Sequence, residues 1–488
     1  MGEWVLDELI AHASAHPDRT AASQDGVPIG YATFVRAIGE MRRAFARAAL
    51  PPKGVAIVRA GLLVESWCAL IALRSLGLDT IVVPDLKVVA ELNLKGVVCV
   101  VGRHKHLADD ETGVPAIAEQ KRVLVPEDLW NVAAAGPLPR PDGASKVGGH
   151  IVHTSGTTGT SKKILMDSGT DAHRVARMAS LHGWPKQPML YSGTLGPWGS
   201  VGYKYPLLVW HEGGCVVFDQ GPEPWGRFFE HKLTAAFLNP VQLRDLPRVA
   251  ARSNRAPGNV EIRVLGAVIG FALVETLQRH VSSTIRTQFG SSECSGIMGS
   301  LLRTPDDIQW YAPFPDRTVE IIDEAGRLCG DGEEGELRVR LLVSDARSYL
   351  DDPETTARFF RDGYFHPGDS AVRRADGRIR VLGRLADVLN IGGAEVALAP
   401  VEQRIRELLG AENVCVFSHL NDAGTNQLAI AYESASPAER DALQQLARQF
   451  PQFGQVRFMR FAEFPRTGSL QKVDRRELRR QVFEGKSR

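Results

Sequence analysis

Short apolar runs that alternate with helix-like segments constrain the fold of this 488-residue chain more than any other feature. Residues 54–58, 80–83 and 96–101 are short runs rich in β-branched side chains, and residues 66–76 between the first two have a helical pattern. Buried strands separated by helices form parallel sheets that are covered by helices. The alternation continues in predicted strands at residues 215–218, 235–238, 263–269 and 284–289, and in helices at residues 241–251 and 273–281. The sequence therefore predicts an α/β fold.

Two other regions have different patterns. Apolar residues recur at helical spacing near residues 5–10 and again over residues 31–48, so two helices are expected at the start of the chain. From about residue 316 onward, short strands alternate with tight turns, as at residues 318–322 and 335–341. Strands joined in this way pair in antiparallel fashion. We therefore expect a β-subdomain at the end of the large domain.

A compact α+β unit is predicted after Arg384. It contains a helix at residues 400–409, two strands, and a second helix opened by residues 436–439, a capping box with proline at the first helical position. We expect a large N-terminal domain over residues 1–385, built of parallel-rich sheets flanked by helices plus the β-subdomain. A small, mobile C-terminal α+β domain is expected over residues 386–488.

The charge balance gives no support for a nucleic-acid or membrane partner. The 58 Lys and Arg residues against 57 Asp and Glu residues leave a formal charge of +1, which creates no field that would attract nucleic acid or anionic lipid. The first residues lack the basic start and apolar middle of a secretion signal, and the apolar runs are far shorter than the roughly 20 residues of a membrane helix. The six cysteines have no CxxC pair and no zinc-ligand spacing, so we expect buried thiols. These patterns favour a cytoplasmic protein.

A loop suited to phosphate binding lies at residues 154–163, which read TSGTTGTSKK. Gly156 and Gly159 can adopt positive φ, the hydroxyls are short donors, and successive backbone N–H groups can point into one concavity. The Walker loop needs GxxxxGK followed by Ser or Thr, but Ser161 stands five residues after Gly156, so that pattern is excluded. A flexible linker is the alternative, although such linkers lack the paired lysines and the flanking apolar runs.

Two later turns carry candidate carboxylates. Glu293 ends the turn at residues 289–293, which follows a predicted strand at the edge where α/β sheets bind ligands. One such carboxylate is sufficient for Mg²⁺ when substrate phosphates and water complete its octahedron. Asp369 ends the Gly/Pro turn at residues 363–369 and can accept hydrogen bonds from both hydroxyls of a ribose. Ordinary surface turns remain the alternative for both segments.

Two further segments suggest a mobile element. Residues 383–393 place Arg384, Asp387 and a double glycine at the predicted domain border, where a hinge must absorb large changes in φ and ψ. A plain interdomain linker is the alternative. Lys472 lies in a Pro/Gly turn near the end of the chain and can be delivered to a site from outside. A solvated turn lysine is the alternative there.

Taken in order, these five segments resemble the adenylate-forming (ANL) superfamily of acyl- and aryl-CoA ligases, peptide-synthetase adenylation domains and luciferases. The resemblance covers nearly the whole chain. It implies that the β- and γ-phosphates of ATP are held by Thr154, Ser155, Gly156, Thr157, Thr158, Gly159 and Lys162. It further implies nucleotide contacts from Phe289, Gly290, Ser291, Ser292, Asp369 and Arg384. Glu293 would hold Mg²⁺, Lys472 would be the catalytic lysine, and Asp387 would be the hinge.

The chemistry implied by the resemblance is ATP-dependent activation of a carboxylic acid. An acyl-adenylate forms with release of pyrophosphate, and the acyl group then passes to a thiol of coenzyme A or of a phosphopantetheinyl carrier protein. No carrier motif follows Lys472, so the acceptor is expected to be a separate molecule. Two alternatives remain, namely an enzyme that transfers the acyl group to a nitrogen nucleophile and a catalytically silent nucleotide-binding homologue.

The acid pocket implied by the resemblance lies between residues 191–204 and the turn at residues 289–299. An aromatic or medium-length acid is expected, because aromatic and apolar side chains predominate among the candidates. The candidate pocket residues are Trp198, Tyr203, Ile269, Ser291, Ile297 and Met298.

The chain also departs from the family pattern. Phe289 replaces a Tyr, Ser161 replaces a Pro and Pro367 replaces a Thr, but none of these changes removes a charged group. Lys472 lies one residue further from Pro465 than is usual, so the loop before it must bulge for the lysine to reach the site. Residues 264–270 also differ from the usual glycine-rich segment.

Overall fold

The computed structural model shows an α/β molecule, which confirms the predicted fold class. The structure describes residues 3–109, 117, 119–130, 147–154, 162–221, 224–253, 258–265, 269–384, 388–391, 394–420, 426–438, 440–449, 456–467 and 471–483. Several predicted site residues lie outside these ranges, namely Ser155, Gly156, Thr157, Thr158, Gly159 and Asp387.

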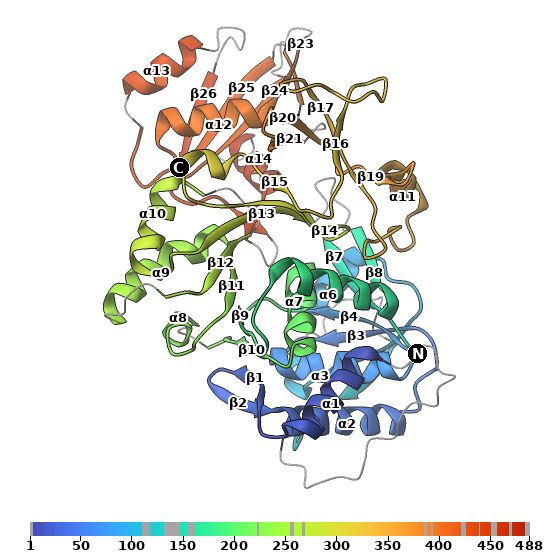
Figure 1. Cartoon of the computed structure of the whole chain (residues 1–488). Helices are drawn as coiled ribbons and strands as arrows, with labels where there is room; N and C mark the ends of the chain where they lie inside the picture. The colour runs from blue at the N-terminus through green and yellow to red at the C-terminus, as the bar shows by residue number, and fades with distance from the viewer. Residues whose placement is uncertain are drawn as a thin grey trace.

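The larger sheet has the strand order β15-β14-β13-β12-β11-β9-β10-β1-β2 (Figure 1). Its parallel strands are β1 (Thr20–Gln24), β9 (Met189–Gly193), β10 (Cys215–Phe218), β11 (Ala235–Leu238), β12 (Glu261–Val264) and β13 (Ile285–Ser291). Antiparallel strands β2 (Val27–Gly30), β14 (Ser295–Leu301) and β15 (Ala312–Pro313) extend its two ends. The strand expected at residues 263–269 ends at Val264, because Val264 pairs with Leu238, the last residue of β11.

A second sheet has the order β6-β5-β3-β4-β7-β8. Its strands are β3 (Val55–Arg59), β4 (Asp79–Val83), β5 (Val97–Gly102), β6 (Lys121–Leu124), β7 (His150–Thr154) and β8 (Lys162–Met166). All neighbours pair in parallel except β7 and β8, whose antiparallel ladder places Thr154 opposite Lys162. The predicted phosphate loop therefore connects two adjacent antiparallel strands.

Helices cover these sheets and fill the space between them (Figure 1). The helices and 3₁₀ turns of this part are α1 (Trp4–Ala15), α2 (Tyr31–Arg47), α3 (Leu63–Ser75), η1 (Leu86–Val88), α4 (Val89–Leu92), α5 (His104–Asp109), α6 (Ser168–His182), α7 (Ser200–His211), α8 (Pro224–Phe228), α9 (Pro240–Ser253), α10 (Phe271–His280) and η3 (Pro305–Ile308). Every residue of α3 is buried. The Trp67 ring of α3 packs on Tyr203 and Trp210 of α7, with centroid distances of 5.7 and 4.9 Å. Aromatic contacts of this kind make α3 and α7 the centre of the core.

The expected β-subdomain follows as an antiparallel sheet. It comprises β16 (Val319–Ile322), β17 (Glu334–Arg340), β18 (Phe360–Arg361), β19 (Tyr364–Phe365), β20 (Asp369–Arg373) and β21 (Ile379–Arg384), with α11 (Pro353–Phe359) beside it. The β20–β21 ladder sets Asp369 directly opposite Arg384. Asp369 and Arg384, which belong to two different predicted segments, are thus neighbours in the sheet.

The last part of the chain forms small sheets and three helices among the described residues. Its elements are β22 (Val388–Ile391), β23 (Ala394–Ala397), α12 (Leu398–Leu409), β24 (Asn413–Leu420), β25 (Asn426–Glu433), α13 (Arg440–Gln449), β26 (Val456–Phe461), β27 (Arg466–Thr467), β28 (Lys472–Val473) and α14 (Arg475–Phe483). Helix α13 begins at Arg440, later than the predicted capping segment, where the Ala438 N–H approaches the Tyr432 hydroxyl at 3.5 Å. An ion pair between Arg244 of α9 and Glu412 joins this unit to the large part. The domain border at residues 385/386 stays a prediction.

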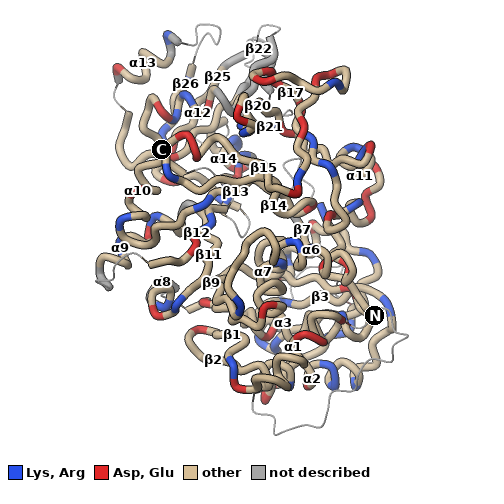
Figure 2. The backbone as a smooth tube through the Cα atoms, viewed as in Figure 1, with Lys and Arg blue, Asp and Glu red and all other residues tan. Residues whose placement is uncertain are grey.

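Charged side chains of both signs are interspersed along the chain (Figure 2), and their numbers nearly balance, with a formal net charge of +1. Among the described residues, no helix combines the length and apolarity needed to span a bilayer. The thiols of Cys68, Cys99, Cys215, Cys294 and Cys415 are buried as expected. Cys329 is the exception, because its turn in the β-subdomain is partly exposed.

A buried charge network joins four helices of the core. The Arg74 guanidinium lies 3.2 Å from the Asp171 carboxylate and 3.4 Å from that of Glu3, and it donates to the Gly148 carbonyl at 3.1 Å. The Tyr203 hydroxyl also contacts Asp171. Glu3, Arg74, Asp171 and Tyr203 belong to or flank α1, α3, α6 and α7, so the network connects these helices. Burial raises the pKa of Glu3 to about 7, although Arg74 opposes this effect.

We predict that Glu3→Gln changes the pH dependence of stability. A carboxyl whose pKa is raised by folding stabilises the protein below its unfolded pKa near 4.5, and this contribution is lost as pH rises through about 7. The free energy of unfolding of the variant, relative to that of the wild type, should therefore increase between pH 5 and pH 8 by about 1–3 kcal/mol. Urea unfolding at several pH values measures this difference. Parallel profiles for the two proteins would contradict it.

Candidate functional site

The hairpin of β13 and β14 carries Glu293 in its turn. The Glu293 side chain is buried, and its Oε1 accepts a hydrogen bond of 2.6 Å from the Tyr349 hydroxyl. Its backbone carbonyl accepts from the Ala346 N–H at 3.0 Å. Within the turn, the Cys294 N–H donates to the Ser291 Oγ at 3.1 Å. Both the backbone and the carboxylate of Glu293 are therefore held by residues of the neighbouring segment 346–349.

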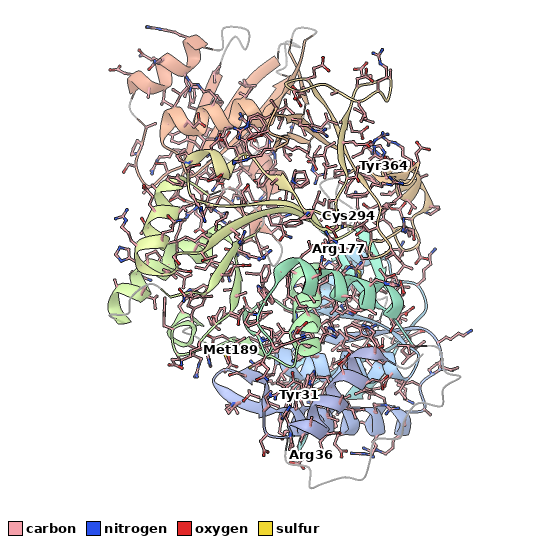
Figure 3. The ribbon with its side chains drawn as sticks, viewed as in Figure 1. Tyr31, Arg36, Arg177, Met189, Cys294 and Tyr364 are labelled. Atoms are coloured by element: carbon pink, nitrogen blue, oxygen red, sulfur yellow. The ribbon has the colours of Figure 1, made fainter. Side chains whose placement is uncertain are left out.

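A buried ion pair clamps the same turn from the other side. Arg317 makes two contacts with Asp345, at 2.5 and 2.8 Å, and both side chains are fully buried. The guanidinium also donates to the carbonyls of Cys294 and Gly296. Arg177 of α6 reaches the Gly296 carbonyl at 3.1 Å. Figure 3 shows Arg177 and Cys294 at the junction between the two sheet-containing halves. The contacts of Arg317 and Arg177 hold the hairpin turn in place between these two parts of the molecule.

The backbone of the turn is tight. Ser295 has a φ of +59°, in the left-handed region that non-glycine residues rarely adopt. A Cβ atom at Gly290 would lie 2.3 Å from the Ser295 carbonyl oxygen, so a side chain cannot be placed there without moving the turn. The predicted Phe-Gly-Ser-Ser-Glu segment thus has glycine where close approach of the two strands requires it.

Lys162 faces this carboxylate across an aromatic surface. Its Nζ lies 3.4 Å from the ring centroid of Phe359 and 5.0 Å from that of Tyr349. Burial lowers the pKa of Lys162, and the charge of Glu293 opposes this. Tyr349 thus contacts Glu293 through its hydroxyl and Lys162 through its ring. Burial and the nearby Glu293 raise the pKa of the Tyr349 phenol, so the hydroxyl stays protonated and donates.

The two lysines of the predicted phosphate loop point to different places. The Lys163 ammonium donates to the Asn93 carbonyl at 3.0 Å, and its own carbonyl accepts from the Leu350 N–H at 2.8 Å. Lys163 therefore connects two surface segments. Of the pair, Lys162 is the lysine that approaches Glu293.

Asp369 and Arg384 form a second charged pair beside the first group. The Arg384 Nε lies 3.2 Å from the Asp369 carboxylate, and the guanidinium donates to the Pro367 carbonyl. Asp369 is buried, whereas Arg384 is exposed. The preceding Gly368 has a φ of +78°, which allows the chain to turn into β20.

Lys472 reaches the same region from the end of the chain. It lies in β28 opposite Thr467, and the charges of Arg384, Glu293 and Asp369 all act on it. Although Lys472 is exposed, desolvation by the neighbouring groups and the Arg384 charge lower its pKa, while the two carboxylates raise it. Gln471, next to the lysine, has a φ of +50°, in the left-handed region. Residues 468–470 of the loop lie outside the described ranges.

The predicted acid-pocket residues lie in different packing environments, and their role in binding an acid stays a prediction. Tyr203 is fully buried, its ring stacks on that of His150 at 4.4 Å, and its hydroxyl joins the Arg74 network, so it has a structural role. Ile297 and Met298 lie in the core of the β-subdomain, and Ile269 packs with the cluster around α10. Trp198 is partly exposed and covers Gly196. Ser291 accepts the hydrogen bond within the Glu293 turn.

Several residues of this region carry no motif that identifies them. Tyr349, Arg317 and Asp345 act through contacts with residues distant in sequence. Lys204 is also near the turn, where its Nζ donates to the Ser295 Oγ at 3.0 Å. A lysine within the otherwise apolar helical stretch 200–211 is a signal that sequence analysis could have used.

The donor set fits a magnesium ion that is shared with a nucleotide. The described residues contain no group of three His, Cys, Asp or Glu side chains that would enclose a metal. Glu293 offers one carboxylate, and Mg²⁺ is commonly bound by one or two carboxylates together with substrate phosphates and water. The nearby Lys162 and Lys472 suit the phosphates that would supply the other ligands.

Comparison with known proteins identifies sequence relatives. A profile of the AMP-binding enzyme family matches residues 11–344. The chain is 28% identical over 410 residues to the 3-[(3aS,4S,7aS)-7a-methyl-1,5-dioxo-octahydro-1H-inden-4-yl]propanoyl:CoA ligase of Mycobacterium tuberculosis, covering 76% of this chain and 75% of that one. It is 26% identical over 307 residues to 2-hydroxy-7-methoxy-5-methyl-1-naphthoate--CoA ligase of Streptomyces carzinostaticus, covering 57% and 54%. With pseudomonine synthase PmsE of Pseudomonas entomophila, 28% identity covers 40% of this chain but only 33% of that protein.

Solved structures share the fold at lower identity. The O-succinylbenzoate coenzyme A synthetase of Bacillus subtilis in complex with AMP superposes with a TM-score of 0.78 and 18% identity, covering 96% of this chain and 97% of that one. The amide bond synthetase McbA of Marinactinospora thermotolerans gives 0.76 and 19%, covering 97% and 99%. These likenesses extend over both the large part and the C-terminal unit.

We predict that Arg317→Met destabilises the protein by about 3–5 kcal/mol, because it leaves Asp345 buried without its partner. Chemical denaturation measures the loss. The control is Arg327→Met, since Arg327 pairs with Asp323 on the exposed surface of the same subdomain. The control should change the unfolding midpoint little. Equal effects of the two substitutions would show that the buried pair does not clamp the turn.

Proposed function

The chain belongs to the AMP-binding enzyme family, and we propose that it activates a carboxylic acid with ATP and transfers the acyl group to a thiol. A carboxylate oxygen attacks the α-phosphorus, the bond to the pyrophosphate oxygen breaks, and acyl-adenylate and pyrophosphate form. The thiol sulfur then attacks the acyl carbon, its proton is released, and AMP leaves with both electrons of the broken bond.

The observation that carries this proposal is the convergence of five charged side chains from distant parts of the chain. Lys162, Glu293, Asp369, Arg384 and Lys472 are linked by direct contact or by the effect of their charges on one another. Three cations and two carboxylates near the predicted phosphate loop suit a nucleoside triphosphate with its metal. Fixed charges of this kind stabilise the charge that develops in phosphoryl transfer.

We assign separate roles to these groups. Lys162 and the preceding loop would bind the β- and γ-phosphates, and Asp369 would accept the ribose hydroxyls, with Arg384 beside it. Glu293 would hold Mg²⁺, which when bound neutralises phosphate charge. Lys472 would donate to oxygen atoms of the acid and the α-phosphate as they approach, which lowers the barrier by positioning and electrostatics.

The second step requires Lys472 to leave the site so that a thiol can enter. We propose that residues 386–488 move as a domain about a hinge at Asp387, while residues 1–385 keep the acyl-adenylate bound. The ion pair between Arg244 and Glu412 must then break. Its side chains are partly exposed, which makes this change inexpensive.

The acid is proposed to be aromatic or of medium length, and the acceptor to be coenzyme A or a carrier protein in the cytoplasm. A nitrogen nucleophile is the second candidate acceptor, favoured by the similarity in fold to an amide bond synthetase. Pyrophosphate exchange with a panel of aryl and alkyl acids tests the first step. Mass spectrometry of the products with and without coenzyme A, and with added amines, tests the acceptor. No exchange with any acid would contradict the proposed activity.

We predict that Lys472→Ala lowers the rate of pyrophosphate exchange at least about 100-fold, the scale of losing one preorganised donor to the reacting oxygens. Thiol transfer from a chemically prepared acyl-adenylate should be affected far less, because Lys472 is absent from the second step. Lys232→Ala, which removes an exposed lysine elsewhere, is the matched control. Equal losses in both half-reactions would contradict the assigned role.

We predict that Tyr349→Phe raises the Mg²⁺ concentration needed for half-maximal exchange and lowers kcat/KM roughly 10-fold, the effect of one lost hydrogen bond to a charged group. The substitution keeps the ring against Lys162 and removes the donor to Glu293. Tyr364→Phe is the control, since its hydroxyl donates to Glu320 in the β-subdomain (Figure 3). An unchanged Mg²⁺ requirement in Tyr349→Phe would argue against the assignment of Glu293.

A further inference from the structure

Lys204 is a buried lysine without a carboxylate partner among the described residues. It lies in the first turns of α7, its side chain is 4% exposed, and its Nζ donates to the Ser295 Oγ at 3.0 Å. An ammonium has three donors, and one neutral hydroxyl satisfies only one of them. Burial of a cation in this state is unfavourable unless another group compensates for the lost hydration.

The surroundings of Lys204 make the site more cationic. Arg174 of α6 is 1% exposed and pairs with Asp171 through Nη1 at 3.1 Å, whereas its Nε and Nη2 have no hydrogen-bond partner within the part of the chain that the structure describes. The charges of Arg174 and Arg177 act on Lys204, and together with burial they lower its pKa well below the usual value. Asp345 and Glu293 oppose this effect from a distance.

The two nearby carboxylates are already engaged. Asp345 forms the buried ion pair with Arg317, and Glu293 accepts from the Tyr349 hydroxyl. Neither carboxylate is within ion-pair distance of Lys204 in the described structure. The Lys204 ammonium therefore has no carboxylate partner among the described residues, and the Nε and Nη2 groups of Arg174 remain without an acceptor there.

The position of Lys204 relates it to the substrate. It connects α7 to the first residue of β14, two residues after Glu293. These are the two segments between which the acid pocket is predicted. We infer that an acid whose carboxyl group reacts near Glu293 and Lys472 enters between these two segments, with its far end toward Lys204.

We propose that Lys204 is a specificity-determining residue that binds a second oxygen group of the acid substrate, either a carboxylate or a phenol oxygen. Arg174 supplies further N–H donors to the same group. The inference rests on the proposed function and narrows its substrate class to acids with a second, strongly accepting oxygen. An anionic group at this position would accept from the N–H groups of Lys204 and Arg174 that have no acceptor among the described residues.

Matched pairs of acids test the proposal. Benzoate is compared with its ortho, meta and para carboxy and hydroxy derivatives, and octanoate with octanedioate. We expect kcat/KM for pyrophosphate exchange by the wild type to favour one of the substituted acids about 10- to 100-fold, the range for a hydrogen bond to a charged group. The carboxy and hydroxy series separate the two forms of the second oxygen group. Lys204→Met should lose this preference and accept the unsubstituted acid better.

A control separates recognition from a structural role of Lys204. Ser295→Ala removes the hydroxyl acceptor and keeps the lysine, so the preference for the substituted acid should persist. Lys204→Met should keep or raise the Tm, because a buried unpaired cation is replaced by an apolar side chain of similar length. A lowered Tm in Lys204→Met together with an unchanged substrate preference would show that the lysine only supports the turn, and would overturn the proposal.

The readouts also distinguish this proposal from the proposed function. If the wild type exchanges pyrophosphate with several acids but prefers the unsubstituted ones, the activity stands and the role of Lys204 is wrong. If no acid supports exchange, the proposed activity is wrong. Thermal unfolding then tests whether Lys204 binds the second oxygen group of the acid. Substituted acids should then raise the Tm of the wild type but not that of Lys204→Met. Equal shifts in both proteins, or none in either, would overturn the assignment of Lys204.

Discussion

The buried ion pair of Arg317 and Asp345 is the interaction on which the arrangement of the site depends. Through the Cys294 and Gly296 carbonyls, the Arg317 guanidinium holds the turn that carries Glu293. Asp345 also accepts from the Leu342 N–H at 2.8 Å, which positions the segment that leads to Tyr349. This pair is thus one of the contacts that join the β-subdomain to the larger sheet, and its loss would leave a charge buried. The position of the Glu293 carboxylate therefore depends on Arg317 and Asp345, neither of which belongs to a motif singled out in the sequence.

The sequence was sufficient to predict the α/β class, the antiparallel subdomain and most strand positions, because burial in parallel sheets produces apolar runs of characteristic length. It was also sufficient to single out Lys162, Glu293, Asp369, Arg384 and Lys472, which the structure brings into one region although their roles are still predictions. Strand β12 ends where its ladder with β11 ends, and α13 begins after Ala438, whose N–H contacts the Tyr432 hydroxyl. Local pattern carries little information about such contacts.

The directions of individual side chains explain the remaining differences between the sequence predictions and the structure. Tyr203 and Lys204 are adjacent on α7, yet the first points into the Arg74 network and the second toward the Glu293 turn. Neighbouring helical residues diverge by about 100° because a turn has 3.6 residues. Without the position of α6 and β14, the sequence could not tell which of the two side chains faces the site. Tyr349 was missed for a related reason, because its partner Glu293 is far away in the chain.

The contact of Arg244 with Glu412 has a consequence for how the C-terminal unit responds to its solution. The two side chains are 37% and 44% exposed, so mobile ions reach them, and an exposed pair of this kind contributes roughly 0–1 kcal/mol. At physiological ionic strength, charges further apart than about 8 Å are largely screened. The contact between α9 and the C-terminal unit is therefore sensitive to salt.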